Sequence, residues 1–267
     1  MITSTSNRRV RELRALAARP RERRETGLFL AEGRRLVEEA PEELLEAVYC
    51  SESFAARPEH EGLIQRLQPE MMADPVFSAV SETQTPQGIL AVVRQRRWEL
   101  SDLTRDGRPL LLLESIQDPG NLGTMLRTGE GAGLGGIIAN RETVDLYNPK
   151  TVRATMGSVY RVPFWVSGDL LETLRQIQAM GYRVYAAHLR GARDYTEEDY
   201  TGPCAFLIGN EGNGLTDATA ARADAAIRIP MEGRVESLNA AIAATLLVYE
   251  ARRQRNLPDG GMITQHE

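Results

Sequence analysis

The amino-acid sequence predicts a two-domain α/β protein whose C-terminal domain is built on a parallel sheet. Its 267 residues fit two domains at roughly 150 residues each. Segments typical of strands alternate with segments of helical periodicity along most of the chain. The uninterrupted apolar run Leu110–Leu113 is typical of a strand that is buried on both faces of a parallel sheet.

Residues 1–96 are expected to form a small α/β domain, because strand-like and helical segments alternate there. Helices are expected over residues 6–18, with Ser6 as the N-cap, after Gly33, and over 59–68. Strands are expected over residues 28–31, 45–50 and 89–93. The polar stretch 97–108 has little apolar periodicity and is expected to be a linker.

Residues 109–256 are expected to form the second domain, in which strands again alternate with helices. The expected strands span residues 110–113, 136–139, 163–166, 183–187, 204–208 and 225–229. The expected helices span residues 121–132, 148–159, 169–180 and 237–253. Residues 257–267 begin with a proline and glycines and are expected to be a flexible tail.

Composition excludes several classes of protein. The two cysteines, Cys50 and Cys204, and three histidines are too few for a disulfide framework or for a metal site. The N-terminal residues contain no apolar signal segment, and no apolar run approaches the length of a membrane span. We therefore expect a cytoplasmic protein with no membrane partner and no metal.

The distribution of charge is uneven. The formal net charge of −5 would by itself argue against a nucleic-acid partner. Residues 8–24, however, contain eight arginines and two glutamates. The average therefore conceals a basic N-terminal segment, for which a solvated helix face and phosphate contacts are the two alternatives.

Two polar clusters directly follow apolar strands, at the strand ends where ligands bind in open α/β sheets. The first spans residues 117–128 and has Asn121 near a helix start, where free N–H groups favour an anion, followed by Arg127. The second spans residues 207–215 and has three glycines around Glu211, which lets the backbone approach a ligand closely. A capped helix and an ordinary turn are the structural alternatives.

A third cluster lies between the last expected strand and the last expected helix. It spans residues 229–241, and both Ser237 and Asn239 lie near the helix start. Either residue could act simply as an N-cap.

The segment Gly131–Gly136 matches the dinucleotide-binding pattern G-x-G-x-x-G but lies in the wrong context. It follows a helix and precedes a strand, whereas the binding pattern follows a strand and opens a helix. We expect these glycines to end the helix and turn the chain. This context disfavours a nicotinamide-dependent oxidoreductase.

In this order, the three clusters resemble the three motifs of the SpoU/TrmH family, S-adenosylmethionine-dependent RNA ribose 2'-O-methyltransferases of the SPOUT superfamily. The first motif is matched by Asn121, Leu122, Gly123, Arg127 and Thr128, and the second by Gly209, Asn210, Glu211, Gly214 and Leu215. The third is matched by Ile229, Pro230, Met231, Gly233, Ser237, Leu238 and Asn239. Residues 30–37 and 83–89 are similar to the substrate-binding domain in the ribosomal-RNA branch of this family.

The resemblance implies a deep trefoil knot of the SPOUT type in the C-terminal domain, and a homodimer with the active site near the subunit interface. It implies an enzyme that methylates RNA, here 23S ribosomal RNA, with S-adenosylmethionine as cofactor. The cofactor contacts that it implies are Leu189, Gly209, Ile229, Met231 and Leu238. The small N-terminal domain would bind RNA, and the residues expected to do so are Arg8, Arg9, Arg11, Arg14 and Arg34.

The same resemblance implies the catalytic residues. It gives Arg127 the central role, as the base or activator of the 2'-hydroxyl. Because arginine is normally a permanent cation, our hypothesis is that Arg127 binds the phosphate beside the target ribose and polarises the hydroxyl, while Asn121, Ser237 and Asn239 orient these groups. Glu211 would position Arg127 or a neighbouring loop. Two further functions remain as alternatives, a tRNA 2'-O-methyltransferase and an RNA-binding protein that has lost catalysis.

Overall fold

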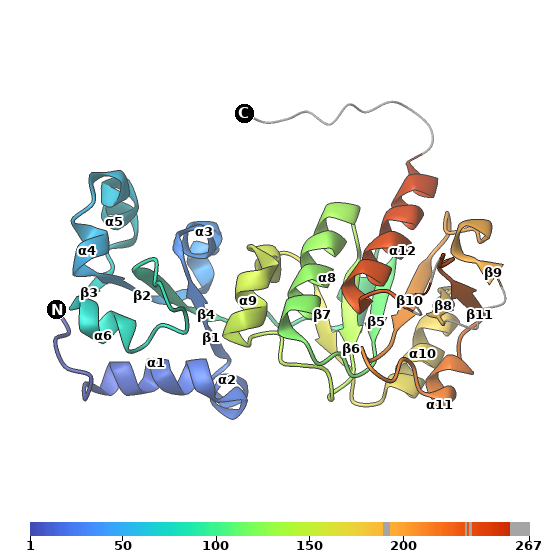
Figure 1. Ribbon diagram of the computed structural model, residues 1–267, viewed down its shortest axis with the longest axis horizontal. Helices are drawn as coiled ribbons and strands as arrows, with labels where there is room; N and C mark the ends of the chain where they lie inside the picture. The colour runs from blue at the N-terminus through green and yellow to red at the C-terminus, as the bar shows by residue number, and fades with distance from the viewer. Residues whose placement is uncertain (189–192, 233, 235–236, 257–267) are drawn as a thin grey trace. The chain divides into compact units, whose positions relative to one another are not determined.

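A computed structural model describes residues 1–188, 193–232, 234 and 237–256 (Figure 1). By its contacts the chain divides into two compact units. The first contains Met1–Arg97, Gln117–Arg127 and Val144–Val162, and the second contains the remainder. Two stretches of the segment expected to form the second domain therefore pack within the first unit, and the domain boundaries themselves stay a prediction.

The first unit is built on a four-stranded sheet with the strand order β1-β4-β2-β3. The strands are β1 (Leu28–Glu32), β2 (Leu45–Ser51), β3 (Glu70–Met72) and β4 (Ile89–Arg94). β4 runs antiparallel to β1 and β2, and β3 runs parallel to β2. Three of these strands were predicted. β3 was not predicted, because its three residues are too few to show an alternating pattern.

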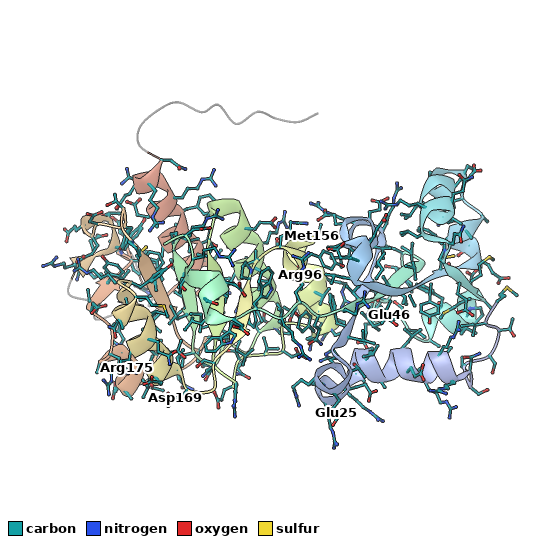
Figure 2. The ribbon with its side chains drawn as sticks, turned by 180° about the vertical axis from the view of Figure 1, so that it is seen from behind. Glu25, Glu46, Arg96, Met156, Asp169 and Arg175 are labelled. Carbon is teal, nitrogen blue, oxygen red and sulfur yellow. The ribbon has the colours of Figure 1, made fainter. Side chains whose placement is uncertain are left out.

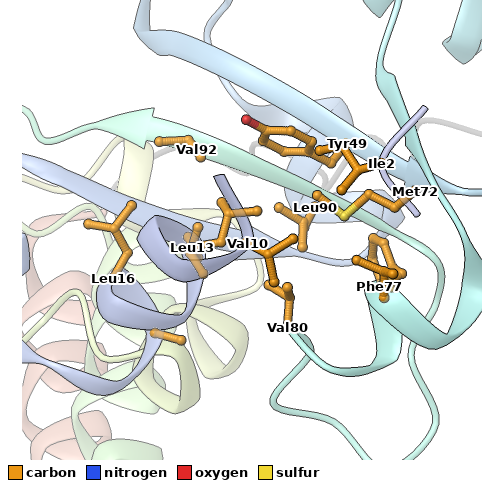
Figure 3. Packing of buried hydrophobic residues seen from close by; sticks show 13 residues of the cluster. Ile2, Val10, Leu13, Leu16, Tyr49, Met72, Phe77, Val80, Leu90 and Val92 are labelled. Atoms are coloured by element: carbon orange, nitrogen blue, oxygen red, sulfur yellow. The ribbon is translucent and has the colours of Figure 1, made fainter. Parts of the chain in front are cut away.

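Helices surround this sheet. They are α1 (Arg8–Ala18), α2 (Pro20–Thr26), α3 (Arg34–Glu39), α4 (Glu52–Ala55), α5 (Glu61–Leu67), α6 (Asp74–Ser78) and α9 (Pro149–Thr155). The amphipathic pattern of α1 is confirmed, since Val10, Leu13 and Leu16 pack against the sheet residues Leu90 and Val92 in one core cluster (Figure 3). The predicted N-cap Ser6 is wrong. Asn7 caps the helix, because its side-chain oxygen accepts the N–H of Arg9 at 2.9 Å.

One arginine of the basic segment is buried in the first unit. Arg23 is 1% exposed and its Nε lies 2.8 Å from Oδ2 of Asp145. Its Nη1 donates to the carbonyl oxygens of Leu16 and Ala17, at 2.6 and 2.8 Å. Removing one partner of a buried ion pair costs roughly 3–5 kcal/mol, because the other charge is left unpaired. Arg23 therefore ties the end of α1 to the segment before α9.

The second unit confirms the predicted parallel sheet. Its seven strands have the order β7-β6-β5-β10-β8-β11-β9, and every neighbouring pair is parallel. The strands are β5 (Leu110–Leu113), β6 (Gly136–Ala139), β7 (Phe164–Val166), β8 (Arg183–Ala187), β9 (Arg193–Asp194), β10 (Cys204–Ile208) and β11 (Ala225–Arg228). The helices are α7 (Leu100–Thr104), α10 (Leu170–Ala179), α11 (Asp217–Ala220) and α12 (Ala240–Arg255), with the last turns of α8 (Pro119–Ala132).

Both faces of this sheet are covered, as the apolar run of β5 predicts. Leu110 and Leu112 pack with Leu174 and Ile177 of α10 in one cluster. The alternate residues of β5 point to the opposite face, where α12 packs on β10. α12 lies beside α8 on this face (Figure 1), and the hydroxyl of Thr245 lies 3.2 Å from that of Thr128.

Three predicted boundaries need correction. The helix predicted over 148–159 ends at Thr155, because Met156 and Gly157 have positive φ angles of 52° and 99° that turn the chain. The helix predicted over 237–253 begins at Ala240. The stretch predicted as a linker contains α7, whose Leu103 is buried in the core of the second unit.

The glycines at the end of α8 and directly after it form the predicted turn. Gly133 has a φ of 77°, and the N–H of Leu134 returns to the carbonyl oxygen of Gly129 at 2.9 Å. The trefoil knot stays a prediction, and the predicted tail 257–267 lies outside the described residues. Within the described part of the chain, no helix has the length and apolar character needed to cross a bilayer.

Candidate functional site

A cavity of about 430 Å³ lies in the second unit, at the C-terminal ends of β8, β10 and β11. The ends of neighbouring parallel strands meet at one edge of a sheet, and small-molecule sites form there. Sites of this kind span roughly 300–1,000 Å³. The described residues that line the cavity are Ala187, His188, Ile208–Leu215, Asp217, Ile227, Ile229, Met231, Ser237, Leu238, Ala240, Ala243 and Leu247.

The loop after β10, residues 209–215, is closed by the side chain and backbone of Asn210. The backbone N–H of Asn210 donates to the carbonyl of Gly214 at 3.0 Å, and that of Gly214 donates to Asn210 at 2.9 Å. The side-chain oxygen of Asn210 accepts the N–H groups of Gly212 and Asn213, at 2.9 and 3.0 Å. One amide side chain therefore holds the loop in a single compact turn.

Two glycines of this loop are required for different reasons. A Cβ at Gly209 would lie 2.2 Å from backbone atoms of Gly214 and Leu215, so no side chain fits there. Gly214 has a φ of 69°, in the left-handed region that favours glycine. By contrast, a Cβ at Gly212 would meet the Asn210 side-chain oxygen at 3.5 Å, which is an ordinary contact.

The third cluster forms another wall of the cavity. Ile229, Met231, Ser237 and Leu238 line it, together with small and apolar residues of α12. Asn239 is the N-cap of α12, since its side-chain oxygen accepts the N–H groups of Ala241 and Ile242 at 2.9 and 3.2 Å.

The first cluster begins α8 as predicted, within the first unit. Asn121 is half-buried in the first turn, and its N–H donates to the carboxylate of Asp118 at 2.8 Å. Gly123 marks a close crossing, because a Cβ there would lie 2.3 Å from that of Ala154 in α9. Arg127 follows one turn later and is exposed, with no ion pair to any residue that the structure describes.

The cavity brings together six of the ten residues predicted for catalysis and cofactor binding. They are Gly209, Glu211, Ile229, Met231, Ser237 and Leu238. Asn121, Arg127 and Asn239 are not among the described lining residues, and Leu189 lies outside the described residues. The role predicted for each of these residues stays a prediction.

Several lining residues were missed by sequence reasoning. Ala187 and His188 end the predicted strand β8, so the position of that strand end was a usable signal. Asp217, Ala243 and Leu247 reach the cavity from helices, and nothing in the local sequence distinguishes them from core or surface residues.

Cysteine chemistry does not contribute to this site. Burial raises the pKa of Cys50 and of Cys204 to about 11, so both thiols stay protonated at neutral pH and are poor nucleophiles. Among the described residues, no group of three or more His, Cys, Asp or Glu could hold a metal ion.

The exposed arginines of the first unit differ in their partners. Arg8 pairs with Glu12, Arg9 with Glu70, and Arg34 with Glu38, while Arg14 donates to the carbonyl oxygen of Ala79. Arg11, Arg19 and Arg24 have no ion-pair partner within the described part of the chain. Figure 2 shows side chains ending in nitrogen beside Glu25, where α2 meets the solvent.

Comparisons with known proteins cover both parts of the chain. The SpoU rRNA Methylase family model matches residues 108–249, and the MRM3-like substrate binding domain model matches residues 7–91. The 23S rRNA (guanosine(2553)-2'-O)-methyltransferase RlmP of Bacillus subtilis (strain 168) is 36% identical over 254 residues, which cover 94% of this chain and 98% of that protein.

Two further relatives differ in how much of the chain they match. The tRNA (guanosine(18)-2'-O)-methyltransferase of Thermus thermophilus is 40% identical over 164 residues, covering 60% of this chain and 83% of its own length. The crystal structure of the SpoU methyltransferase AviRb from Streptomyces viridochromogenes, in complex with the cofactor AdoMet, has a TM-score of 0.84 and 28% identity, and covers 95% of this chain and 100% of its own. The predicted family resemblance is confirmed, and the chain belongs to the SpoU rRNA methylase family.

Proposed function

We propose that this protein transfers a methyl group from S-adenosylmethionine to a ribose 2'-hydroxyl of RNA, with 23S ribosomal RNA as the substrate. The observation that carries the proposal is the cavity at the ends of β8, β10 and β11, which is bordered by the glycine loop 209–215. The similar proteins RlmP and AviRb are named as a 23S rRNA 2'-O-methyltransferase and a SpoU methyltransferase bound to AdoMet.

Ribosomal RNA is favoured over tRNA by the extent of the matches. RlmP aligns with 94% of this chain, so its match extends into the segment 7–91, which matches a substrate-binding domain. The named tRNA methyltransferase aligns with 60% of the chain. A ribosomal-RNA substrate also favours the cytoplasm as the place where the protein acts.

The cavity fits the proposed cofactor. Its volume suits a molecule of nucleoside size, and it has apolar walls from Ile229, Leu238 and Leu247 beside the polar loop 209–215. A Cβ at Gly209 would collide with the backbone of Gly214 and Leu215, so glycine at this position lets the two ends of the loop lie close together beside the cavity. Gly209, Ile229, Met231 and Leu238 would hold the cofactor, which supplies an electrophilic methyl group on a sulfonium.

The remaining predicted residues would orient the RNA. The exposed guanidinium of Arg127 would bind a phosphate beside the target ribose, for which its planar fork of donors is suited. Arginine has no acceptor atom, so Arg127 would polarise the hydroxyl, and the proton would pass to water or to a phosphate oxygen. Asn121, Ser237 and Asn239 would fix the ribose, and correct orientation alone accelerates such transfers strongly.

We also propose a homodimer and the trefoil knot that the family resemblance implies. Ile242 and Tyr249 are large apolar side chains of α12 that are 49% and 45% exposed. They are seven residues apart and therefore lie on the same face of the helix. A second copy of the chain would cover them.

Alanine at position 209 is expected to weaken cofactor binding. In Gly209→Ala the new Cβ collides with the backbone of Gly214, so the loop shifts and the Kd for S-adenosylmethionine in calorimetry rises at least about tenfold. Gly202→Ala is the matched control and should bind like the wild type, because a Cβ there meets no atom within 4 Å and Gly202 is not among the described lining residues. Equal affinities of Gly209→Ala and the wild type would contradict the proposed cofactor site.

Replacing Arg127 by lysine is expected to slow methyl transfer. Arg127→Lys keeps the charge but loses the bidentate fork, so the single-turnover rate on 23S rRNA transcripts falls at least about tenfold while S-adenosylmethionine affinity is retained. A wild-type rate would contradict the proposed role.

Mapping of 2'-O-methyl sites in total RNA from cells with and without the gene tests the substrate, and a site lost from tRNA would overturn the ribosomal assignment.

The arginines without ion pairs are expected to contact RNA phosphates. In the triple variant Arg11→Gln/Arg19→Gln/Arg24→Gln, the slope of log K against log salt should become shallower by roughly two to three, since each duplex contact contributes about 0.9. The control Arg105→Gln/Arg175→Gln/Arg222→Gln removes the same charge from exposed positions of the second unit. Equal slopes for the two variants would count against this surface.

The proposed dimer is expected to depend on the exposed face of α12. Sedimentation equilibrium should give twice the mass of one chain, and Tyr249→Asp should shift the population toward monomer, because a charge cannot be buried there unpaired. A monomeric wild type at micromolar concentration would exclude the dimer.

A further inference from the structure

A buried carboxylate lies directly behind the proposed cofactor loop. Glu114 is the first residue after β5, is 7% exposed and does not line the cavity among the residues described. We infer that Glu114 is the positioning residue that sets the shape of the loop 209–215, and through it the affinity for S-adenosylmethionine. This inference rests on the proposed function, because it assigns the control of that same site.

The carboxylate of Glu114 binds the residues at which the loop ends. Its Oε1 accepts the hydroxyls of Thr216 and Thr219, at 2.9 and 2.5 Å. Its Oε2 accepts the backbone N–H of Thr216 at 2.8 Å. Leu215 and Asp217, on either side of Thr216, both line the cavity. The carboxylate therefore fixes the exit of the loop where it borders the ligand space.

The start of the loop is held by Glu114 and by its neighbour Ser115. The backbone N–H of Glu114 donates to the carbonyl oxygen of Ile208, at the end of β10, at 2.9 Å. The carbonyl oxygen of Ser115 accepts Nδ2 of Asn210 at 2.8 Å. Ser115 has a positive φ of 58°, and its N–H donates to the side-chain oxygen of Asn140 at 2.8 Å. Glu114 and Ser115 thus clamp both ends of the loop onto β5.

The three donors around Glu114 require a carboxylate. Both of its oxygens act as acceptors, and together they take two hydroxyls and one backbone N–H. A glutamine would place an NH₂ group where one carboxylate oxygen now accepts a hydrogen bond. At least one of the three donors, the N–H of Thr216 or a threonine hydroxyl, would then have lost its acceptor. An aspartate is one methylene shorter and cannot reach Thr216 and Thr219 without a backbone shift. Among the described residues these three bonds are made to Glu114, so we expect the shape of the loop to depend on this carboxylate.

The effect of disrupting this clamp should appear in cofactor affinity more than in turnover. Glu114 acts through Thr216 and Thr219, and the loop they fix forms one wall of the cavity. We expect Glu114→Gln and Thr219→Val to raise the Kd and KM for S-adenosylmethionine at least about tenfold. The kcat at saturating S-adenosylmethionine should stay within about twofold of the wild type.

The experiment compares these variants with a conservative replacement and a matched control. Thr219→Ser keeps the hydroxyl and should restore wild-type affinity, which a general packing defect would not do. The control is Thr173→Val on α10, another buried threonine of the second unit, whose hydroxyl lies 2.7 Å from that of Ser167 and away from the cavity residues. Affinity is measured by calorimetry with S-adenosylmethionine alone, and the Tm of each full-length variant is recorded.

Each outcome decides the inference. A wild-type Kd for S-adenosylmethionine in both Glu114→Gln and Thr219→Val overturns the inference. It is also overturned if Thr173→Val and Thr219→Val have the same Tm and lose the same amount of affinity for S-adenosylmethionine. If Glu114→Gln does not fold, the Thr219→Val and Thr219→Ser pair decides alone. Absence of S-adenosylmethionine binding by the wild-type protein overturns the proposed function and this inference together, whereas binding by the wild type with unaffected variants overturns the inference alone.

Discussion

The parallel pairing of β10 with β5 on one side and β8 on the other is the constraint on which the cavity depends. Because all three strands run in the same direction, their C-terminal ends meet at one edge of the sheet. The residues that follow them then lie together, which places Asn210 and His188 at the cavity and Glu114 behind the loop that borders it. β5 and β10 are buried at every position, so their apolar side chains alone do not favour one register over another. A shift in register would separate the residues that follow these strands.

The sequence predicted this part of the fold well, because its signals are local. The run Leu110–Leu113 identifies a strand covered on both faces, and the motif glycines identify a tight loop at the end of β10. Four of the five residues predicted to bind the cofactor, which the family resemblance identified, line the cavity. The start of α12 was misplaced because Ser237 and Asn239 are equally good caps by type. Asp217 and Leu247 reach the cavity through tertiary packing, which local periodicity does not reveal.

The basic N-terminal segment shows a second limit of sequence reasoning. The sequence alone suggests that all eight arginines of this segment lie on one surface. In the structure, Arg23 is buried against Asp145. Arg9 pairs with Glu70, which is distant along the chain. Ion pairs between residues that are distant in sequence depend on the folded arrangement. The structure was therefore needed to identify which arginines of this segment have no ion-pair partner among the described residues.

The order of strands in the second unit also bears on how the protein is made. β10 pairs with β5 across about 95 residues of chain, and α12, which lines the cavity, follows β10. During synthesis from the N-terminus, β5 leaves the ribosome long before β10 and α12 have been made. Contacts between distant segments form slowly. The ligand cavity is therefore among the last features of the protein to exist, and a chain released before α12 would have a partial sheet but no closed cavity.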